Sequence, residues 1–385
     1  MIPYGRQDID EADIQAVVDV LRSDWLTQGP AIERFEQAVA HYCGARYAVA
    51  VSNATAALHI ACMAADLHAG DILWTSPNTF VASANCALYC GAQADFVDID
   101  PQHYNLDIDA LERKLALAEQ SGRLPKIVIP VHFAGQSCDM ERIGQLGKRY
   151  GFSIIEDASH AIGARYRDRP VGCCSFSDMA VFSFHPVKII TTGEGGMIVT
   201  NRKDLHERLL RLRSHGITRD PAQMEQPSDG PWSYEQIELG FNYRMTDMQA
   251  ALGASQIERL DEFVQRRHAL AQRYDALLAD LPLLVPKQDP GGHSAFHLYV
   301  IRLDLAAIGK TRREVFDQLR QRGIGVNVHY IPVHTQPYYQ RMGFQPSDFP
   351  VAVQYYDEAI SLPLFFGLSH TMQEEVVAAI REVLR

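Results

Sequence analysis

Short apolar runs alternate with longer amphipathic stretches along the first half of the chain. The runs are rich in Val and Ile and predict buried strands at Tyr47–Asn53, Asp71–Asn78, Ala94–Asp100, Lys126–Gly135, Phe152–Ser159, Met179–His185 and Gly196–Asn201. The amphipathic stretches predict helices at Glu11–Ser23, Ala54–Ala65, Thr79–Cys90, Ile108–Ala118 and Asp139–Tyr150. Buried strands that alternate with helices are typical of an α/β fold with a mostly parallel sheet covered on both faces.

The pattern changes in the second half. A long helical region is predicted from Met245 to Leu281, and the Pro- and Gly-rich segment Pro282–Ser294 breaks it. A smaller α/β unit follows, with two further helices near the C-terminus and the elements Ser294–Leu303 (strand), Thr311–Gly323 (helix) and Ile324–His334 (strand). We therefore expect a large domain over residues 1–250 and, over 251–385, a long connecting helix with a small C-terminal domain. The polar stretch Asp220–Pro231 is predicted to be a surface loop.

Composition narrows the class of protein. Of the 385 residues, 47% are hydrophobic and 22% charged, which is typical of an ordinary globular protein. The net charge of -11 argues against a broad surface for nucleic acid or an anionic membrane, although a local pocket can still bind a small anion. The polar start predicts no signal peptide, and no apolar run is long enough to span a bilayer. Seven scattered cysteines without a CxxC pair favour free thiols in a reducing cytoplasm over a disulfide framework.

Polar residues follow several predicted strands, at the edge where open α/β sheets bind ligands. The segment Ser52–Thr55 opens a helix, and it fits either an ordinary helix cap or a cradle for a phosphate. Phe80 fits either stacking on a planar ligand or core packing. Asp157 ends an apolar run, where a carboxylate either pairs with a cation or caps a helix. His160 fits the same site or simple packing.

Lys188 lies between an apolar strand and the glycine-rich segment Gly193–Gly196. A lysine beside an apolar strand end loses hydration, which lowers its pKa and frees the amine as a nucleophile, whereas the alternative is a solvated surface lysine. The glycines allow a tight turn and close approach to a ligand. A helix N-terminus, an aromatic ring, a carboxylate and a lysine amine together match the phosphate, ring, ring nitrogen and aldehyde of pyridoxal phosphate.

Longer segments carry a family resemblance. They are WLTQGP, SNATAALHIA, SPNTFVASAN, VHFAGQ, EDASHAIGA, FSFHPVKIITTGEGGMIVTN, RSHGIT, GFNYRMTDMQAALGASQ and VHYIPVH. In this order, over nearly the whole chain, they resemble the DegT/DnrJ/EryC/StrS family of pyridoxal-phosphate sugar aminotransferases. The resemblance implies the fold type I aminotransferase architecture, with a large mixed seven-stranded sheet domain and a smaller C-terminal α/β domain. It also implies a homodimer with shared active sites.

The resemblance assigns roles to individual residues. Lys188 matches the lysine that bonds covalently to the cofactor, Asp157 the acid that pairs with its ring nitrogen, and His160 a residue near its phenolic oxygen. The other matched positions are Ala54, Thr55, Ala56 and Ser183 for the phosphate, Phe80 for the ring, Asn242 for the phosphate of the partner subunit's cofactor, and His329 for the sugar nucleotide. His329 and His334 leave a metal site as an alternative, but no carboxylate or cysteine stands at ligand spacing, so no metal is expected.

The segments FSFHPVKIITTGEGG and LGFNYRMTDMQAALG are most similar to one branch of the family. This branch moves an amino group from L-glutamate to C4 of a UDP-linked 4-keto-6-deoxy-N-acetylhexosamine, giving UDP-4-amino-4,6-dideoxy-N-acetyl-β-L-altrosamine for pseudaminic acid synthesis. Another branch has histidine in place of this lysine and deoxygenates sugars, so Lys188 favours transamination. The alternatives are amination of another UDP-, dTDP- or GDP-linked keto sugar, and a non-catalytic protein that binds pyridoxal phosphate as a sensor.

Overall fold

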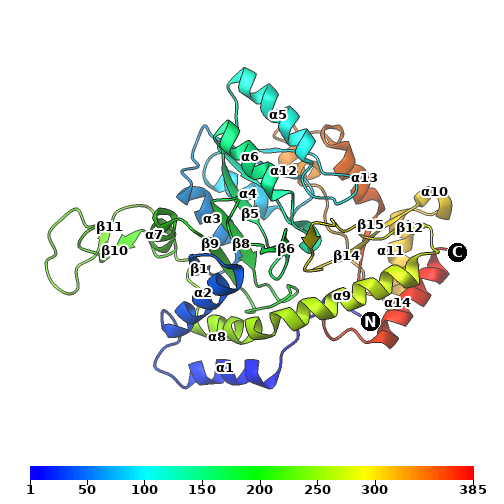
Figure 1. The fold of residues 1–385 in the computed structure, drawn as a ribbon, viewed down its shortest axis with the longest axis horizontal. Coiled ribbons are helices and arrows are strands. Elements are labelled where there is room, and N and C mark those ends of the chain that lie inside the picture. The colour runs from blue at the N-terminus through cyan, green and yellow to red at the C-terminus, as the bar shows by residue number, and fades with distance from the viewer.

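The computed structural model describes residues 1–385 and centres on a seven-stranded mixed sheet (Figure 1). Its strands lie in the order β1 (Tyr47–Val51), β9 (Gly196–Thr200), β8 (Met179–Ser183), β5 (Ser153–Asp157), β4 (Ile127–Ile129), β2 (Ile72–Thr75) and β3 (Gln93–Phe96). Only β9 runs antiparallel to its neighbours. The other six strands therefore end at the same edge, and the predicted seven-stranded mixed sheet is confirmed.

Both faces of this sheet are buried, which explains the nearly continuous apolar runs. Successive side chains of a strand point to opposite faces, so Val49 and Val51 pack on one side while Ala48 and Ala50 pack on the other. The first face is covered by α3 (Ala54–Ala64), α4 (Ala82–Tyr89) and α7 (Lys203–Leu212). The second is covered by α2 (Pro30–Cys43), α5 (Ile108–Ser121), α6 (Met140–Tyr150) and α8 (Asp247–Gln256).

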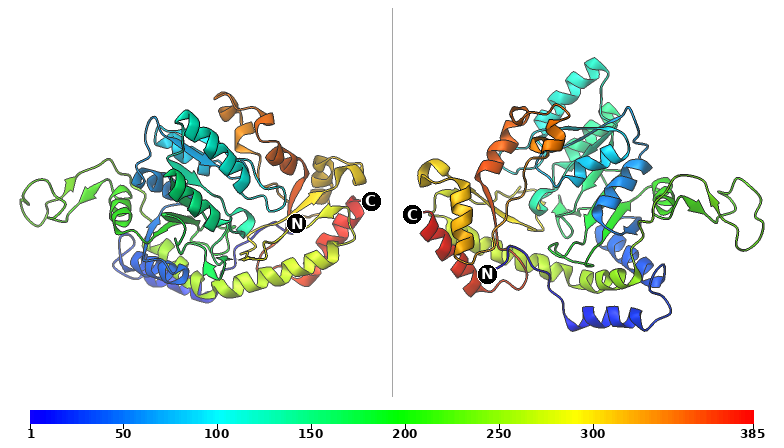
Figure 2. Two further views of the ribbon diagram at one scale, coloured as in Figure 1. Left: turned by 45° about the horizontal axis from the view of Figure 1, so that its top comes forward. Right: turned by 180° about the vertical axis from the view of Figure 1, so that it is seen from behind.

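A second core surrounds a small antiparallel sheet of β12 (Leu283–Leu284), β14 (Tyr299–Leu303) and β15 (Ala359–Leu362). The long helix α9 (Leu260–Leu278) reaches this sheet from the large one, and α11 (Arg312–Gln321) and α14 (His370–Val383) pack on the same core (Figure 1). The start of the chain joins this region too, because Ile2 bridges to Ile324 (Figure 2).

The remaining elements are short or peripheral. They are α1 (Glu11–Leu21), α10 (Leu305–Ile308), α12 (Pro337–Gln340), α13 (Pro350–Glu358), β6 (Arg165–Tyr166), β7 (Arg169–Pro170), β10 (Ile217–Thr218), β11 (Glu235–Gln236), β13 (Gly292–His293) and 3-10 turns at Phe133–Gly135, Ile257–Arg259, Val333–Thr335 and Pro346–Asp348. No helix combines the length and the apolar character that crossing a bilayer requires. All seven cysteines are unpaired.

Several elements differ from the sequence prediction. The prediction overlooked α2 and α7, although α2 carries clear signals: Pro30 at its first position and Gly44, with φ of 70°, after its end. The predicted helix Met245–Leu281 is divided by the 3-10 turn between α8 and α9. The predicted strand Ile324–His334 is wrong, because this segment pairs only through isolated bridges.

An arm projects from the large sheet beyond α7 (Figure 1). Its base is the two-stranded pair β10 and β11, and Asp220–Pro231 forms most of the loop between them. This loop is largely exposed, as predicted for a surface loop.

Candidate active site

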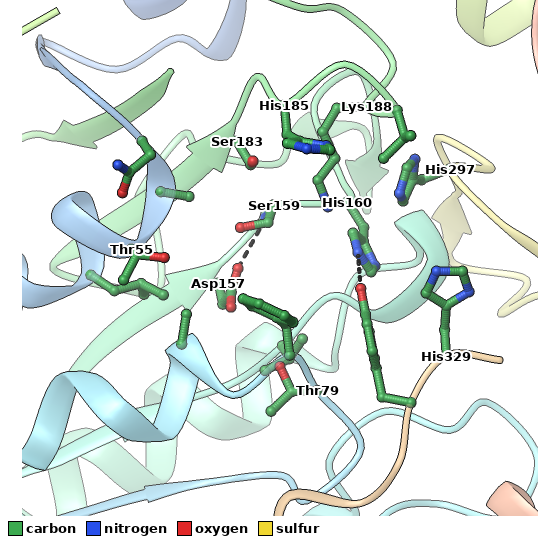
Figure 3. Close-up of a pocket in the computed structure, with 18 of the residues that line it drawn as sticks. Thr55, Thr79, Asp157, Ser159, His160, Ser183, His185, Lys188, His297 and His329 are labelled. Atoms are coloured by element: carbon green, nitrogen blue, oxygen red, sulfur yellow. Dashed lines mark hydrogen bonds between the residues drawn. The ribbon is translucent and has the colours of Figure 1, made fainter. Parts of the chain in front are cut away.

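A cavity of about 650 Å³ opens at the edge where the strands end. Its wall includes eight of the ten residues singled out from the sequence: Ala54, Thr55, Phe80, Asp157, His160, Ser183, Lys188 and His329 (Figure 3). Ala56 and Asn242 are not part of the wall. The Ala56 N–H donates to the Asn53 side chain, and Asn242 is exposed on a segment that bridges to Ser214.

The cavity forms where the ends of β1 and β8 and the start of β9 meet the N-terminus of α3. Gly196 at the start of β9 lies opposite Val51 of β1 and Ser183 of β8. A Cβ on Gly196 would lie 2.5 Å from the Asn53 carbonyl carbon and 2.7 Å from the Ala54 nitrogen. Glycine is therefore required for the N-terminus of α3 to lie against the sheet.

The N-terminus of α3 retains donors for an anion. Asn53 caps the helix, with its Oδ1 accepting the Ala56 N–H at 2.8 Å. The Ala57 N–H bonds to the Asn53 carbonyl. The first-turn N–H groups of Ala54 and Thr55 remain for a ligand, and the helix dipole favours negative charge there. The segment is thus both a cap and an anion site.

Asp157 is a buried carboxylate at the end of β5, with an exposed fraction of 5%. It accepts hydrogen bonds from Ser83 Oγ at 2.6 Å and from the Ser159 N–H at 3.1 Å. Because the Ser83 proton goes to Asp157, the 2.7 Å contact between Thr79 and Ser83 has Thr79 as donor. This chain of donors stabilises a carboxylate that points into the cavity.

Lys188 lies on the loop between β8 and β9. Hydrogen bonds from the Phe184 N–H to Gly195 and from the Thr192 N–H to Phe184 close the base of this loop. Burial lowers the pKa of Lys188 to about 8, against the opposing effect of the Asp157 charge. A larger fraction of the amine is therefore unprotonated near neutral pH than in an ordinary lysine, as a nucleophile requires.

Three of the imidazole rings on the cavity wall, those of His160, His297 and His329, add no charge beside this amine. Burial lowers the pKa of His160 and His297 well below the usual histidine range and that of His329 to about 3, and the Lys188 charge adds to each effect. All three rings are therefore neutral. Lys188 is the only Lys or Arg on the wall.

Phe80 and Tyr330 are neighbouring aromatic side chains on the cavity wall. Phe80 is 57% exposed, so core packing is excluded, and its ring centroid lies 6.3 Å from that of Tyr330. The Tyr330 hydroxyl lies 3.0 Å from His160 Nε2. A planar ligand between Asp157 and Lys188 would meet the exposed Phe80 ring.

Sequence reasoning overlooked Ser83, His297 and Tyr330. Ser83 stands one helical turn after Thr79, a spacing that signals side-chain contact on a helix face. His297 is a lone polar residue within the apolar run SAFHLYVIRL, and Tyr330 follows His329 directly. Nothing in the local pattern separates these two from core residues, because only the tertiary fold brings them to the cavity.

Comparisons with known proteins agree with this geometry. Residues 7–381 match the model of the DegT/DnrJ/EryC1/StrS aminotransferase family. The chain is 39% identical to the spore coat polysaccharide biosynthesis protein SpsC of Bacillus subtilis (100% of this chain, 97% of the relative). It is 35% identical to the UDP-4-amino-4-deoxy-L-arabinose–oxoglutarate aminotransferase of Shewanella sediminis (100% and 98%).

Two solved structures superimpose over the whole chain, each with a TM-score of 0.90 and 30% identity. One is PseC of Helicobacter pylori, an aminotransferase of pseudaminic acid biosynthesis (100% of this chain, 99% of that chain). The other is the Streptococcus pneumoniae protein Spr1654, assigned as a sugar aminotransferase, in its PMP form (100% and 99%). The same protein is also known in a PLP form.

The fold and the cavity are those of a fold type I aminotransferase that uses pyridoxal phosphate. The chain belongs to the DegT/DnrJ/EryC1/StrS aminotransferase family and is a sugar aminotransferase. Its donor set fits the cofactor: a helix N-terminus suits the phosphate, a buried carboxylate suits a protonated ring nitrogen, and an amine of lowered pKa suits the aldehyde.

The lowered pKa of Lys188 predicts its reactivity. In cofactor-free protein, acylation of Lys188 by acetic anhydride should rise with pH to a midpoint near 8 instead of the ordinary 10.5, because only the unprotonated amine reacts. Peptide mass spectrometry measures this, with exposed Lys203 as internal reference. Asp157→Asn should move the midpoint lower, because the carboxylate raises the pKa. A midpoint near 10.5 would contradict the burial effect.

The close approach at Gly196 predicts weaker cofactor binding when a side chain is added. In Gly196→Ala, the new Cβ would push the N-terminus of α3 away from the sheet, and we expect the Kd for pyridoxal phosphate to rise at least about tenfold. Absorbance titration measures the Kd. Gly291→Ala, where the nearest atom is an Asp289 oxygen at 3.5 Å, is the matched control. Equal affinity of the Gly196 variant and the control would show that the helix position is not critical.

Proposed function

We propose that this aminotransferase moves the amino group of L-glutamate to C4 of a UDP-linked 4-keto-6-deoxy-N-acetylhexosamine, giving UDP-4-amino-4,6-dideoxy-N-acetyl-β-L-altrosamine for pseudaminic acid synthesis. The single observation that carries the reaction type is Lys188, an amine of lowered pKa beside Asp157. The acceptor is inferred from the similarity to Helicobacter pylori PseC, and the donor from the name of the Shewanella relative, which includes oxoglutarate.

A second acceptor is favoured by a different comparison. The chain is more similar to the spore coat polysaccharide protein of Bacillus subtilis, at 39% identity, than to PseC, at 30%. The second candidate function is therefore amination of another nucleotide-linked keto sugar. Both candidates use the same residues and the same chemistry, so they differ only in the sugar that the cavity accepts.

The geometry of the cavity supports cofactor-binding roles for several residues of its wall. The first-turn N–H groups of Ala54 and Thr55, with the Ser183 hydroxyl, hold the phosphate. Asp157, oriented by Ser83 and Ser159, would keep a proton on the ring nitrogen of the bound cofactor, and Phe80 would stack on its ring. His160, on the same wall, would lie near the phenolic oxygen of the bound cofactor.

Lys188 has two roles, as covalent anchor and as proton carrier. Pyridoxal phosphate, when bound, supplies an electron sink that makes the α-proton of an amino acid acidic. With its amine free, Lys188 Nζ would take the proton from Cα of glutamate in the first half-reaction. In the second half-reaction it delivers a proton to C4 of the sugar. Its neutral histidine neighbours do not stabilise the amine as a cation, so it can both take up and release a proton.

The cavity of one chain is incomplete for these substrates. The cofactor phosphate and, in separate half-reactions, the two glutamate carboxylates or the sugar diphosphate bring several negative charges, whereas Lys188 is the only lysine or arginine of the wall. We infer that a second copy completes the site in a homodimer. Trp232 on the projecting arm and Leu239 just after it are both about 70% exposed, and burial of these apolar side chains against a second copy would favour association. Exposed Asn242, which does not reach its own cavity, is the residue proposed to contact the partner's phosphate.

Lys188→Ala should lose turnover completely, because anchor and proton carrier disappear together. In wild-type protein we expect L-glutamate to remove the visible absorbance band of bound pyridoxal phosphate. After removal of excess glutamate, UDP-2-acetamido-2,6-dideoxy-β-L-arabino-4-hexulose should restore it. Restoration by a different keto sugar nucleotide instead would establish the second candidate. Normal turnover by the Lys188 variant, or absence of the band after cofactor is supplied, would refute the proposed chemistry.

Mixing two inactive variants tests the role of Asn242 across the interface. Lys188→Ala and Asn242→Ala homodimers should each have low activity. A mixed dimer has one site with both native residues, so random mixing should recover about a quarter of wild-type activity. Activity measured after unfolding and refolding the mixture checks this. If mixing recovers no activity, or if a sedimenting monomer is fully active, the shared site is wrong.

A further inference from the structure

The cavity wall contains a histidine whose side chain has no hydrogen-bond partner. His297 is 4% exposed, lies on the wall beside His160 with ring centroids 4.4 Å apart, and its buried Nδ1 has no partner. Nε2 makes no hydrogen bond within the chain either. Burying an unpaired polar group costs free energy. An unpaired histidine on a cavity wall therefore points to a ligand that supplies the missing hydrogen bond.

The environment of His297 determines which nitrogen carries the proton. The pKa of His297 is lowered well below the usual range by burial, with further effects of His160 and Lys188, so the ring is neutral and carries one proton. A buried N–H without a partner is rarer than a buried acceptor without one. The proton therefore belongs on Nε2, and Nε2–H is a donor directed into the cavity.

Tyr330 is a second donor on the same wall. The Ala134 N–H donates to His160 Nδ1 at 3.3 Å, which places the His160 proton on Nε2. That proton is donated to the Tyr330 oxygen at 3.0 Å. The Tyr330 proton then has no acceptor within the chain. Burial and the Asp157 charge raise the pKa of Tyr330, so its hydroxyl stays protonated.

Both donors are held in place by the fold. The buried guanidinium of Arg267 donates to the carbonyls of Phe296 at 3.1 Å and His297 at 3.2 Å, and the Leu298 N–H bonds to Ala134. The Tyr330 N–H bonds to Asn78. His160 lies between the two donors, with its ring stacked on that of Tyr330 at 6.0 Å and 20°.

We propose that His297 Nε2–H and the Tyr330 hydroxyl together bind the α-carboxylate of the amino donor. The inference rests on the proposed function. The amine of the donor must react at the place where Lys188 reacts. The carbon of its α-carboxylate is only two bonds from this amine, so the carboxylate lies close to the wall residues His297 and Tyr330. Two neutral donors match its two oxygens, and the wall has no arginine for this task.

Two probes isolate the α-carboxylate. α-Methyl-L-glutamate has no α-proton and binds without turnover, whereas 4-aminobutanoate has the amine and the distal carboxylate but no α-carboxylate. Their Kd values for the holoenzyme are measured by calorimetry for wild type, His297→Phe, Tyr330→Phe and His297→Gln. His334→Phe is the matched control, because His334 is also buried with an unpartnered Nδ1 but lies outside the cavity.

For both Phe variants we expect the Kd of α-methyl-L-glutamate to rise at least about tenfold, with that of 4-aminobutanoate changed less than about threefold. His297→Gln, which keeps an N–H donor, should recover part of the loss, and the control should match wild type. Unchanged binding of α-methyl-L-glutamate, or an equal loss for both probes, would overturn the proposal. The cofactor absorbance band and the melting temperature of each variant separate this result from misfolding. If wild type itself does not react with L-glutamate, the proposed function fails, and this inference with it.

Discussion

One buried carboxylate opposite one amine is the constraint on which the rest of the site depends. Asp157 is nearly inaccessible to solvent and is compensated by donors from Ser83 and Ser159, so its charge is retained inside the protein. Lys188 loses hydration in the same space, and the Asp157 charge only partly restores its basicity. His160, His297 and His329 are neutral, so these three rings add no positive charge that would compete for the carboxylate.

The amino-acid sequence was sufficient to predict the sheet and several residues at its edge. Strands buried on both faces have a strong apolar signal, and parallel strands place the residues that follow them together. For this reason the residue pattern alone groups Asp157 with Lys188. The assignment of roles to these residues, and the inclusion of Ser183, came from the family resemblance. The segment Ile324–His334 misled the prediction, because its apolar and aromatic residues pack against other segments instead of forming a ladder.

What could not be predicted depends on contacts between distant parts of the chain. His297 and Tyr330 reach the cavity from the C-terminal region. The hydrogen bonding of Tyr330 and the protonation of His297 both depend on His160, which is well over a hundred residues away in the sequence. Their protonation states follow only from partners that the fold supplies. Long-range geometry, more than residue type, therefore decides which polar groups remain free for a substrate.

The first residues of the chain have a consequence for biosynthesis. Tyr4 lines the cavity, and its carbonyl accepts the Leu364 N–H at 3.0 Å, while Ile2 bridges to Ile324. During translation these early residues leave the ribosome long before their partners exist. The large sheet can form from the nascent chain, but the cavity wall closes only after more than three hundred further residues have been made. Full enclosure of the cavity consequently depends on contacts between residues more than three hundred positions apart, which are slow to form.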